Sequence, residues 1–94
     1  MALLVYDISF TKHAEREFSK LNRILQQRII NTLERIRIRP EAYVVKLVGD
    51  PAFKLRVGDY RLLLDINQSK LIILVIKIGH RKKVYDVKAR AHHQ

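Results

Sequence analysis

The segment "FKLRVGDYRLLLD", Phe53 to Asp65, has the residue pattern of a β-hairpin. Apolar and polar side chains largely alternate on both sides of Gly58-Asp59, and this dipeptide favours a two-residue hairpin turn. Such a turn pairs Arg56 with Arg61. Because side chains alternate between the two faces of a strand, both arginines and Lys54 then share one face. The segment therefore predicts a strand pair with one apolar and one cationic face.

Two like charges directly opposite each other destabilise a strand pair by a few tenths of a kcal/mol to ~1 kcal/mol, so the pair of Arg56 and Arg61 requires an explanation. In one interpretation, the long side chains extend into solvent or are neutralised by Asp59 or Asp65. In the other, the arginines bind a phosphate, because the planar guanidinium matches phosphate oxygens. The apolar face is expected to form the core, and it carries Phe53, Leu55, Val57, Tyr60, Leu62 and Leu64.

The residues before the hairpin predict a strand and two helices. "LLVYDIS" near the N-terminus alternates as a strand does, and Ser9 or Thr11 can cap the helix that follows. A second helix is predicted from Ile24 to Arg39, where Pro40 ends it. Apolar stripes at helical spacing support both helices: Ala14, Phe18 and Leu21 in the first, and Leu25, Ile29, Leu33 and Ile36 in the second.

Three extended runs follow the helices: residues 43–48 leading into 53–57, then residues 60–66, and then residues 71–78. This order predicts an α+β fold, with an N-terminal strand and an antiparallel helix hairpin packed on one face of a mainly antiparallel four-stranded sheet. No repeat or linker interrupts the chain, so residues 1–94 are expected to form a single domain, with residues 89–94 as a flexible tail.

The last predicted strand, Leu71 to Ile78, brings further polar residues to the hairpin. With residues 67–70 as the connecting loop, Arg61 is expected opposite Ile76. The strand then ends beside the Gly58-Asp59 turn, and the residues that reach the cationic edge are His80, Arg81, Lys82, Lys83 and Tyr85. The cationic face also has an apolar centre, which consists of Leu63, Ile72, Leu74 and Ile76. Either the C-terminal segment folds back over it or a partner covers it, and we favour a partner over at least part of it.

The charge of the chain indicates a polyanionic partner, because 19 Lys and Arg against 9 Asp and Glu give a net charge of +10. Nucleic acid is favoured over a membrane surface, since the basic residues are spread through strands and helices. The chain has no Cys, and its four His residues (His13, His80, His92 and His93) do not form a convincing metal set, so no cofactor is expected. No apolar run approaches the roughly 20 residues of a membrane span, and we expect a cytoplasmic protein without a membrane partner.

The cationic face suits metal-independent cleavage of RNA. When the ribose 2′-hydroxyl attacks the adjacent phosphorus, the reaction needs a base, stabilisation of the phosphate charge and an acid for the leaving 5′-oxygen. Neighbouring cations favour the neutral, basic form of an amine, so Arg56 and Arg61 make Lys54 the candidate base. Tyr85 is a candidate for stacking on a nucleobase or for proton transfer. His80 is a weaker candidate for acid or base, because a single His beside a turn is more often structural or exposed.

The stretches "FKLRVGDYRLLLDI" and "VIKIGHRKKVYD" resemble motifs of the RelE/ParE superfamily of toxin-antitoxin toxins, and more specifically of its RelE-like branch. The resemblance covers most of the chain. It implies the toxin of a type II toxin-antitoxin system, a ribosome-dependent endoribonuclease that cuts mRNA in the ribosomal A site and is neutralised by a cognate antitoxin in a heteromeric complex.

The resemblance also implies a role for each matching residue. Lys54 is the general base, Arg56 and Arg61 stabilise the phosphate and the transition state, Arg81 is the acid or a charge stabiliser, and Tyr85 orients the RNA by stacking on a base. His80, Lys82 and Lys83 complete the expected RNA-binding site. Ala52 stands where some RelE-like enzymes have a further lysine.

Two alternatives remain beside the ribonuclease. The ParE branch shares the fold and the general "RVGDYR" pattern but inhibits DNA gyrase without this nuclease site. A non-catalytic RNA- or ribosome-binding module would also account for the charge, with binding that weakens as salt is added.

Overall fold

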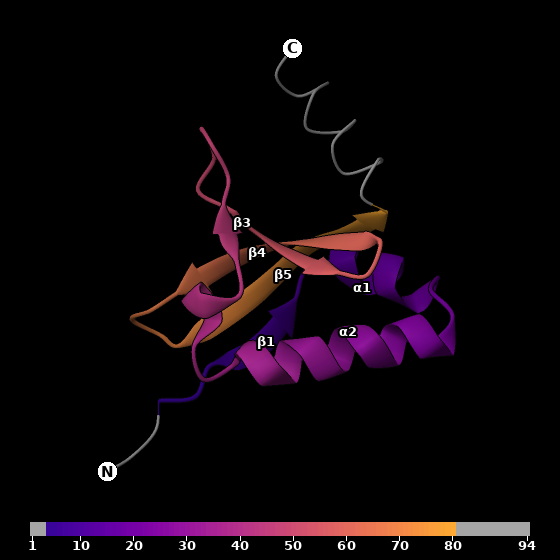
Figure 1. The fold of residues 1–94 in the computed structure, drawn as a ribbon, viewed down its shortest axis with the longest axis horizontal. Coiled ribbons are helices and arrows are strands. Elements are labelled where there is room, and N and C mark those ends of the chain that lie inside the picture. The colour runs from indigo at the N-terminus through magenta and orange to yellow at the C-terminus, as the bar shows by residue number, and fades with distance from the viewer. Residues whose placement is uncertain (1–3, 81–94) are drawn as a thin grey trace.

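Residues 4–80, which the computed structural model describes, form an α+β fold with two α-helices and five strands in one sheet (Figure 1). In chain order the elements are β1 (Asp7–Phe10), α1 (Lys12–Ser19), α2 (Arg23–Ile36), the short 3-10 helix η1 (Pro40–Ala42), β2 (Val45–Lys46), β3 (Phe53–Val57), β4 (Tyr60–Asn67) and β5 (Ile72–His80). The predicted fold class is confirmed. The tail predicted at residues 89–94 lies outside the described residues.

The sheet has the order β1-β5-β4-β3-β2, and its neighbouring strands are antiparallel except for β1 and β5, which are parallel. It has one strand more than expected, because Val45 and Lys46 pair with β3 as the short edge strand β2. The helices cover one face, where the core lies. The buried core side chains include Ala14 from α1, Ile29, Leu33 and Ile36 from α2, and Leu62, Leu64, Ile73 and Val75 from the sheet.

Both α-helices begin at a capping side chain. The Oγ1 atom of Thr11 accepts a hydrogen bond from the Ala14 N–H at 3.0 Å, and the Oδ1 atom of Asn22 accepts one from the Leu25 N–H at 2.8 Å. Each side chain thus satisfies a backbone donor that has no partner within the first turn of its helix. Of the two predicted caps for the first helix, Thr11 is the one that the structure uses.

The second helix ends at Ile36, before the expected end at Arg39. Pro40 disfavours a helical conformation in the residue before it, and Arg39 has φ −146° and ψ 75°. Just after the helix, the carbonyl of Arg37 accepts a hydrogen bond from the Tyr6 N–H at 2.9 Å, and Arg37 Nε donates to the Tyr6 carbonyl at 2.7 Å. These contacts join the end of α2 to the chain just before β1.

The hairpin of β3 and β4 has the register that the Gly58-Asp59 turn predicts. Val57 lies opposite Tyr60, Arg56 opposite Arg61, and Lys54 opposite Leu63. On the helix-covered face, Leu55, Val57, Leu62 and Leu64 are buried, while Phe53 and Tyr60 are half-buried against the core. The prediction of one core face and one cationic face is therefore confirmed for this strand pair.

The register predicted between β4 and β5 is wrong: Arg61 lies opposite Gly79 and not opposite Ile76. The strand β4 continues to Asn67, whose Oδ1 atom accepts a hydrogen bond from the Lys70 N–H at 2.9 Å and so stabilises the turn. A register shift between Leu63 and Leu64 then moves the pairing further along β5. In the observed register, the end of β5 lies closer to the arginine pair than it does in the predicted register.

Candidate nucleic-acid interface

The cationic face of the hairpin brings three of the predicted site residues together. Arg56 and Arg61 lie directly opposite each other, and Lys54 lies on the same face two residues before Arg56. Arg56 is exposed, whereas Lys54 and Arg61 are half-buried. The arrangement combines an amine with two guanidinium groups on neighbouring strands, which is a set of donors suited to phosphate oxygens.

The β3–β4 turn holds the Arg56 side chain. Gly58 has φ +60°, a left-handed conformation that glycine adopts without strain, and its carbonyl accepts a hydrogen bond from Arg56 Nε at 3.2 Å. Within residues 4–80, the Arg56 guanidinium forms no ion pair with an acidic side chain, so neither Asp59 nor Asp65 neutralises it. This outcome disfavours, for Arg56, the interpretation in which a neighbouring carboxylate cancels the charge.

The end of β5 completes the described part of the interface. Tyr60 lies opposite His80, and their rings contact edge to face with centroids 5.6 Å apart and an interplanar angle of 75°. Figure 1 shows this end of β5 beside the β3–β4 turn. The prediction that the last strand ends next to this turn is confirmed, and the strand brings His80 to the same end of the hairpin as the turn. Arg81, Lys82, Lys83 and Tyr85 follow His80 in the chain and lie outside the described residues.

A carboxylate from α1 holds the last part of β5 in place, and the sequence did not single it out. Glu17 Oε1 accepts a hydrogen bond from the Ile78 N–H at 2.7 Å, and Glu17 Oε2 lies 3.8 Å from Lys77 Nζ. Just before the helix, Thr11 Oγ1 donates to the Ile76 carbonyl at 2.9 Å. Helix α1 and its cap thus satisfy backbone groups of β5 beyond the residues that pair with β1. The sequence signal that could have identified Glu17 is an acidic residue next to Phe18, which belongs to the apolar stripe of this helix. In the structure both side chains are half-buried.

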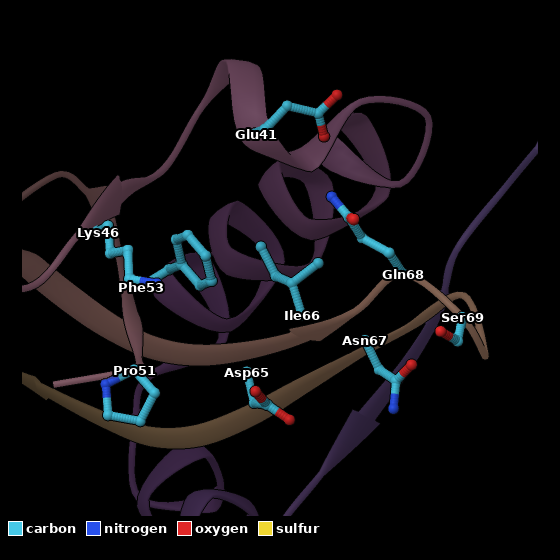
Figure 2. Close-up of a pocket in the computed structure, with 9 residues that line it drawn as sticks. All are labelled: Glu41, Lys46, Pro51, Phe53, Asp65, Ile66, Asn67, Gln68 and Ser69. Atoms are coloured by element: carbon cyan, nitrogen blue, oxygen red, sulfur yellow. The ribbon is translucent and has the colours of Figure 1, made fainter.

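A pocket of about 520 Å³ lies at the other end of β4, away from the β3–β4 turn (Figure 2). Its wall includes the ring of Phe53, and Lys46 Nζ lies 5.5 Å from the centre of this ring. Of the predicted site residues that the structure describes, Lys54, Arg56, Arg61 and His80, none lines it. The lining residues are Glu41, Lys46, Pro51, Phe53, Asp65, Ile66, Asn67, Gln68 and Ser69.

Metal-binding clusters and membrane-spanning helices are both absent from residues 4–80. In this range, no group of three or more His, Cys, Asp or Glu side chains is arranged to hold a metal ion. None of the helices in this part of the chain is both long and apolar enough to cross a lipid bilayer.

Comparison with known proteins identifies the family. The family model of the ParE toxin of the type II toxin-antitoxin system parDE matches residues 8–85. The chain belongs to this toxin family. Within the RelE/ParE superfamily its relatives place it in the RelE-like branch: it is 30% identical to a RelE-like toxin protein of Escherichia coli over 87 residues, which cover 87% of this chain and 92% of the relative.

Two further comparisons agree with this assignment, and a third supports the fold. The toxin is 28% identical over 83 residues to the mRNA interferase toxin RelE of Escherichia coli strain K12, covering 85% of this chain and 87% of the relative. A chain of the intact RelBE toxin-antitoxin complex of Escherichia coli superposes with a TM-score of 0.68 at 30% identity, over 80% of this toxin and 95% of that chain. A RelBE-type complex from Mycobacterium tuberculosis has a TM-score of 0.75 at 23% identity, over 81% and 98% of the two chains, and supports the fold alone.

Proposed function

We propose that this toxin is a ribosome-dependent endoribonuclease that cuts mRNA in the ribosomal A site without a metal ion and so inhibits translation. The observation that carries the proposal is the pairing of Arg56 with Arg61 on the face that also holds Lys54, at the edge where β5 ends. Two guanidinium groups held across a strand pair provide a binding site for the phosphate on which charge develops.

In the proposed reaction, Lys54 Nζ takes the proton of the ribose 2′-hydroxyl as the 2′-oxygen attacks the adjacent phosphorus. Arg56 and Arg61 stabilise the negative charge that builds on the phosphate oxygens. The bond from phosphorus to the 5′-oxygen breaks, and that oxygen receives a proton, a step that we assign to Arg81. The products are a 2′,3′-cyclic phosphate and a 5′-hydroxyl. Tyr85 orients the RNA by stacking on a base.

The relatives supply the support for the partners. A relative that is 28% identical is named an mRNA interferase, which favours mRNA as the substrate. A structural neighbour at 30% identity is a toxin bound to its antitoxin. We infer a cognate antitoxin that forms a heteromeric complex with this toxin, and action on ribosomes in the cytoplasm. A net charge of +10 favours both an acidic antitoxin surface and ribosomal RNA.

The test adds purified toxin to ribosomes that carry a defined mRNA codon in the A site and maps the RNA ends. We expect cleavage within the codon and a cyclic phosphate at the new 3′ end. Arg61→Ala and Lys54→Ala should each lower the cleavage rate by at least about a hundredfold. Arg81→Ala should lose cleavage and remain folded. Lys12→Ala, which removes the same charge from an exposed position on α1, is the control. Intact mRNA after addition of the wild-type toxin would refute the proposal.

A ParE-like inhibitor of DNA gyrase is the second candidate, because the matching family model is that of the ParE toxin. This function requires a protein-binding surface and no cleavage. Supercoiling of a plasmid by purified gyrase distinguishes the two functions. Inhibition of supercoiling at toxin concentrations that leave mRNA intact would favour the ParE-like function, and mRNA cleavage without an effect on gyrase would exclude it.

A further inference from the structure

Helix α2 brings a further cation, Arg28, to the β3–β4 turn. A methyl group at position 58 would lie 3.3 Å from Arg28 Nη1, 3.4 Å from Nη2 and 3.5 Å from Cζ, so the guanidinium rests against the α-carbon of Gly58. The carbonyl of the same glycine holds Arg56 Nε. The turn therefore carries one guanidinium from the helix layer and one from the cationic face of the hairpin. Arg28 lies outside the apolar stripe of α2, and the sequence did not single it out.

The position of Arg28 leaves it available to a ligand. Its side chain is exposed, and within residues 4–80 its guanidinium forms no hydrogen bond or ion pair. Two cations on one turn repel each other unless an anion lies near both. Since Arg28 and Arg56 approach the turn from different layers, a chain of phosphates that passes over the turn can contact both.

A pocket of about 340 Å³ lies at the same end of the molecule, on the side of α1. Tyr60 and His80 line it and provide aromatic rings on which a nucleobase can stack. Lys20 adds a cation, while the carboxylate of Glu17 already accepts the Ile78 N–H. Within residues 4–80, the remaining lining residues are Leu21, Ile78 and Gly79. Aromatic side chains beside basic ones are typical of sites that bind single-stranded nucleic acid.

We propose that Arg28 and this pocket form a second nucleotide-binding subsite, which holds the nucleotide next to the one cleaved at Arg56 and Arg61. Arg28 binds the phosphate of that nucleotide, and its base enters the pocket at Tyr60 and His80. The subsite rests on the proposed endoribonuclease function and adds to it. It takes single-stranded RNA, because a base in a duplex cannot stack on protein side chains.

The decisive comparison is between Arg28→Ala and Arg35→Ala. Both arginines are exposed on α2, and seven residues, close to two helical turns, separate them, so the variants lose the same charge from the same side of one helix. The toxin concentration that gives half-maximal cleavage on programmed ribosomes is measured for each, with thermal melting to confirm folding. We expect Arg28→Ala to raise this concentration about tenfold, because it removes charge-assisted hydrogen bonds to a phosphate. Arg35→Ala should change it less than about twofold.

Three further readouts separate a binding role from a structural one. The slope of log affinity against log salt should fall by roughly 0.7 in Arg28→Ala, as expected for one contact to single-stranded RNA, and should not change in Arg35→Ala. Arg28→Lys should recover part of the affinity, since it restores the charge without the planar fork. A 2-aminopurine next to the cleaved nucleotide should be quenched when the wild-type toxin binds, and less when His80→Ala binds.

Each outcome bears on a different proposal. If the wild-type toxin leaves mRNA intact, the endoribonuclease function fails and the subsite fails with it. If the wild-type toxin cleaves but Arg28→Ala and Arg35→Ala have equal half-maximal concentrations and equal salt slopes, the endoribonuclease function stands and the subsite is refuted. The subsite is also refuted if 2-aminopurine remains unquenched both when it precedes and when it follows the cleaved nucleotide.

Discussion

Replacement of Gly58 by alanine tests the geometry of the β3–β4 turn, on which the arrangement of the cationic face depends. Where the backbone suits both residues, a change from glycine to alanine stabilises a protein by about 0.4–1 kcal/mol, because it restricts the unfolded chain. At φ +60°, however, an L-residue is strained by about 1–2 kcal/mol. We therefore expect Gly58→Ala to lower the free energy of unfolding by about 1 kcal/mol, which lowers Tm by about 4–8 °C in a domain of this size.

Gly49→Ala is the matched control, because Gly49 has φ +72° and, among residues 4–80, no atom beyond Gly49 and its two chain neighbours lies within 4 Å of the position of an added methyl group. Gly49→Ala should lower the free energy of unfolding by about the same amount, roughly 1 kcal/mol, because the backbone strain is the same. At Gly58 the methyl group would also lie 3.3 Å from Arg28 Nη1 and should displace the side chain of this exposed residue. Gly58→Ala is therefore expected to lose a few tenths of a kcal/mol more stability than Gly49→Ala, and this difference should vanish when Arg28→Ala is added.

The assay is urea unfolding of the purified toxin, followed by circular dichroism, with the midpoint and the slope fitted for each variant. A gain in stability for Gly58→Ala would refute the left-handed turn, because it is the result expected for a glycine in an ordinary extended or helical conformation. A loss at Gly58 with a gain at Gly49 would show that only the β3–β4 turn has the geometry described.

Two further predictions concern β5 and the arginine pair. Glu17→Ala should lower the free energy of unfolding by roughly 1.5–3 kcal/mol, because the Ile78 N–H loses a charged acceptor. Glu17→Gln should lower it by roughly 1 kcal/mol or less. Equal losses in the two variants would show that the hydrogen bond is unimportant. Arg56→Glu should be more stable than Arg56→Ala by roughly 0.2–1 kcal/mol, because the introduced carboxylate faces Arg61 with the opposite charge. The same substitution should abolish cleavage. Urea unfolding measures the first effect and the ribosome assay the second, and undiminished cleavage would remove position 56 from the mechanism.

The arginine pair gives a physical reason to expect a conflict between stability and activity in this toxin. Arg56 and Arg61 face each other without a carboxylate that pairs with Arg56 in the described part of the chain. Like charges in this position destabilise the hairpin, and a bound phosphate removes the repulsion. RNA, or an acidic segment of an antitoxin, should therefore stabilise the folded toxin as any ligand of the native state does.

Much of the fold follows from local patterns in the sequence. The apolar stripe of α2 predicted the buried residues Ile29, Leu33 and Ile36, because a helix has a fixed period of 3.6 residues. The Gly58-Asp59 turn predicted the register of β3 and β4, because a two-residue turn permits only one pairing of the strands that it joins. The cationic face of the site was therefore predictable before the tertiary structure was known.

Tertiary structure alone decided the arrangement at the end of β5 and the contacts between the layers. A four-residue loop and a bulge do not fix a register, so the position of Gly79 opposite Arg61 depended on how β5 packs against β1 and the helices. The hydrogen bond from Ile78 to Glu17 and the contact of Arg28 with Gly58 join residues far apart in the chain. Sequence periodicity specifies which face of an element is apolar, but the packing of the elements determines which polar side chains from different layers meet at the site.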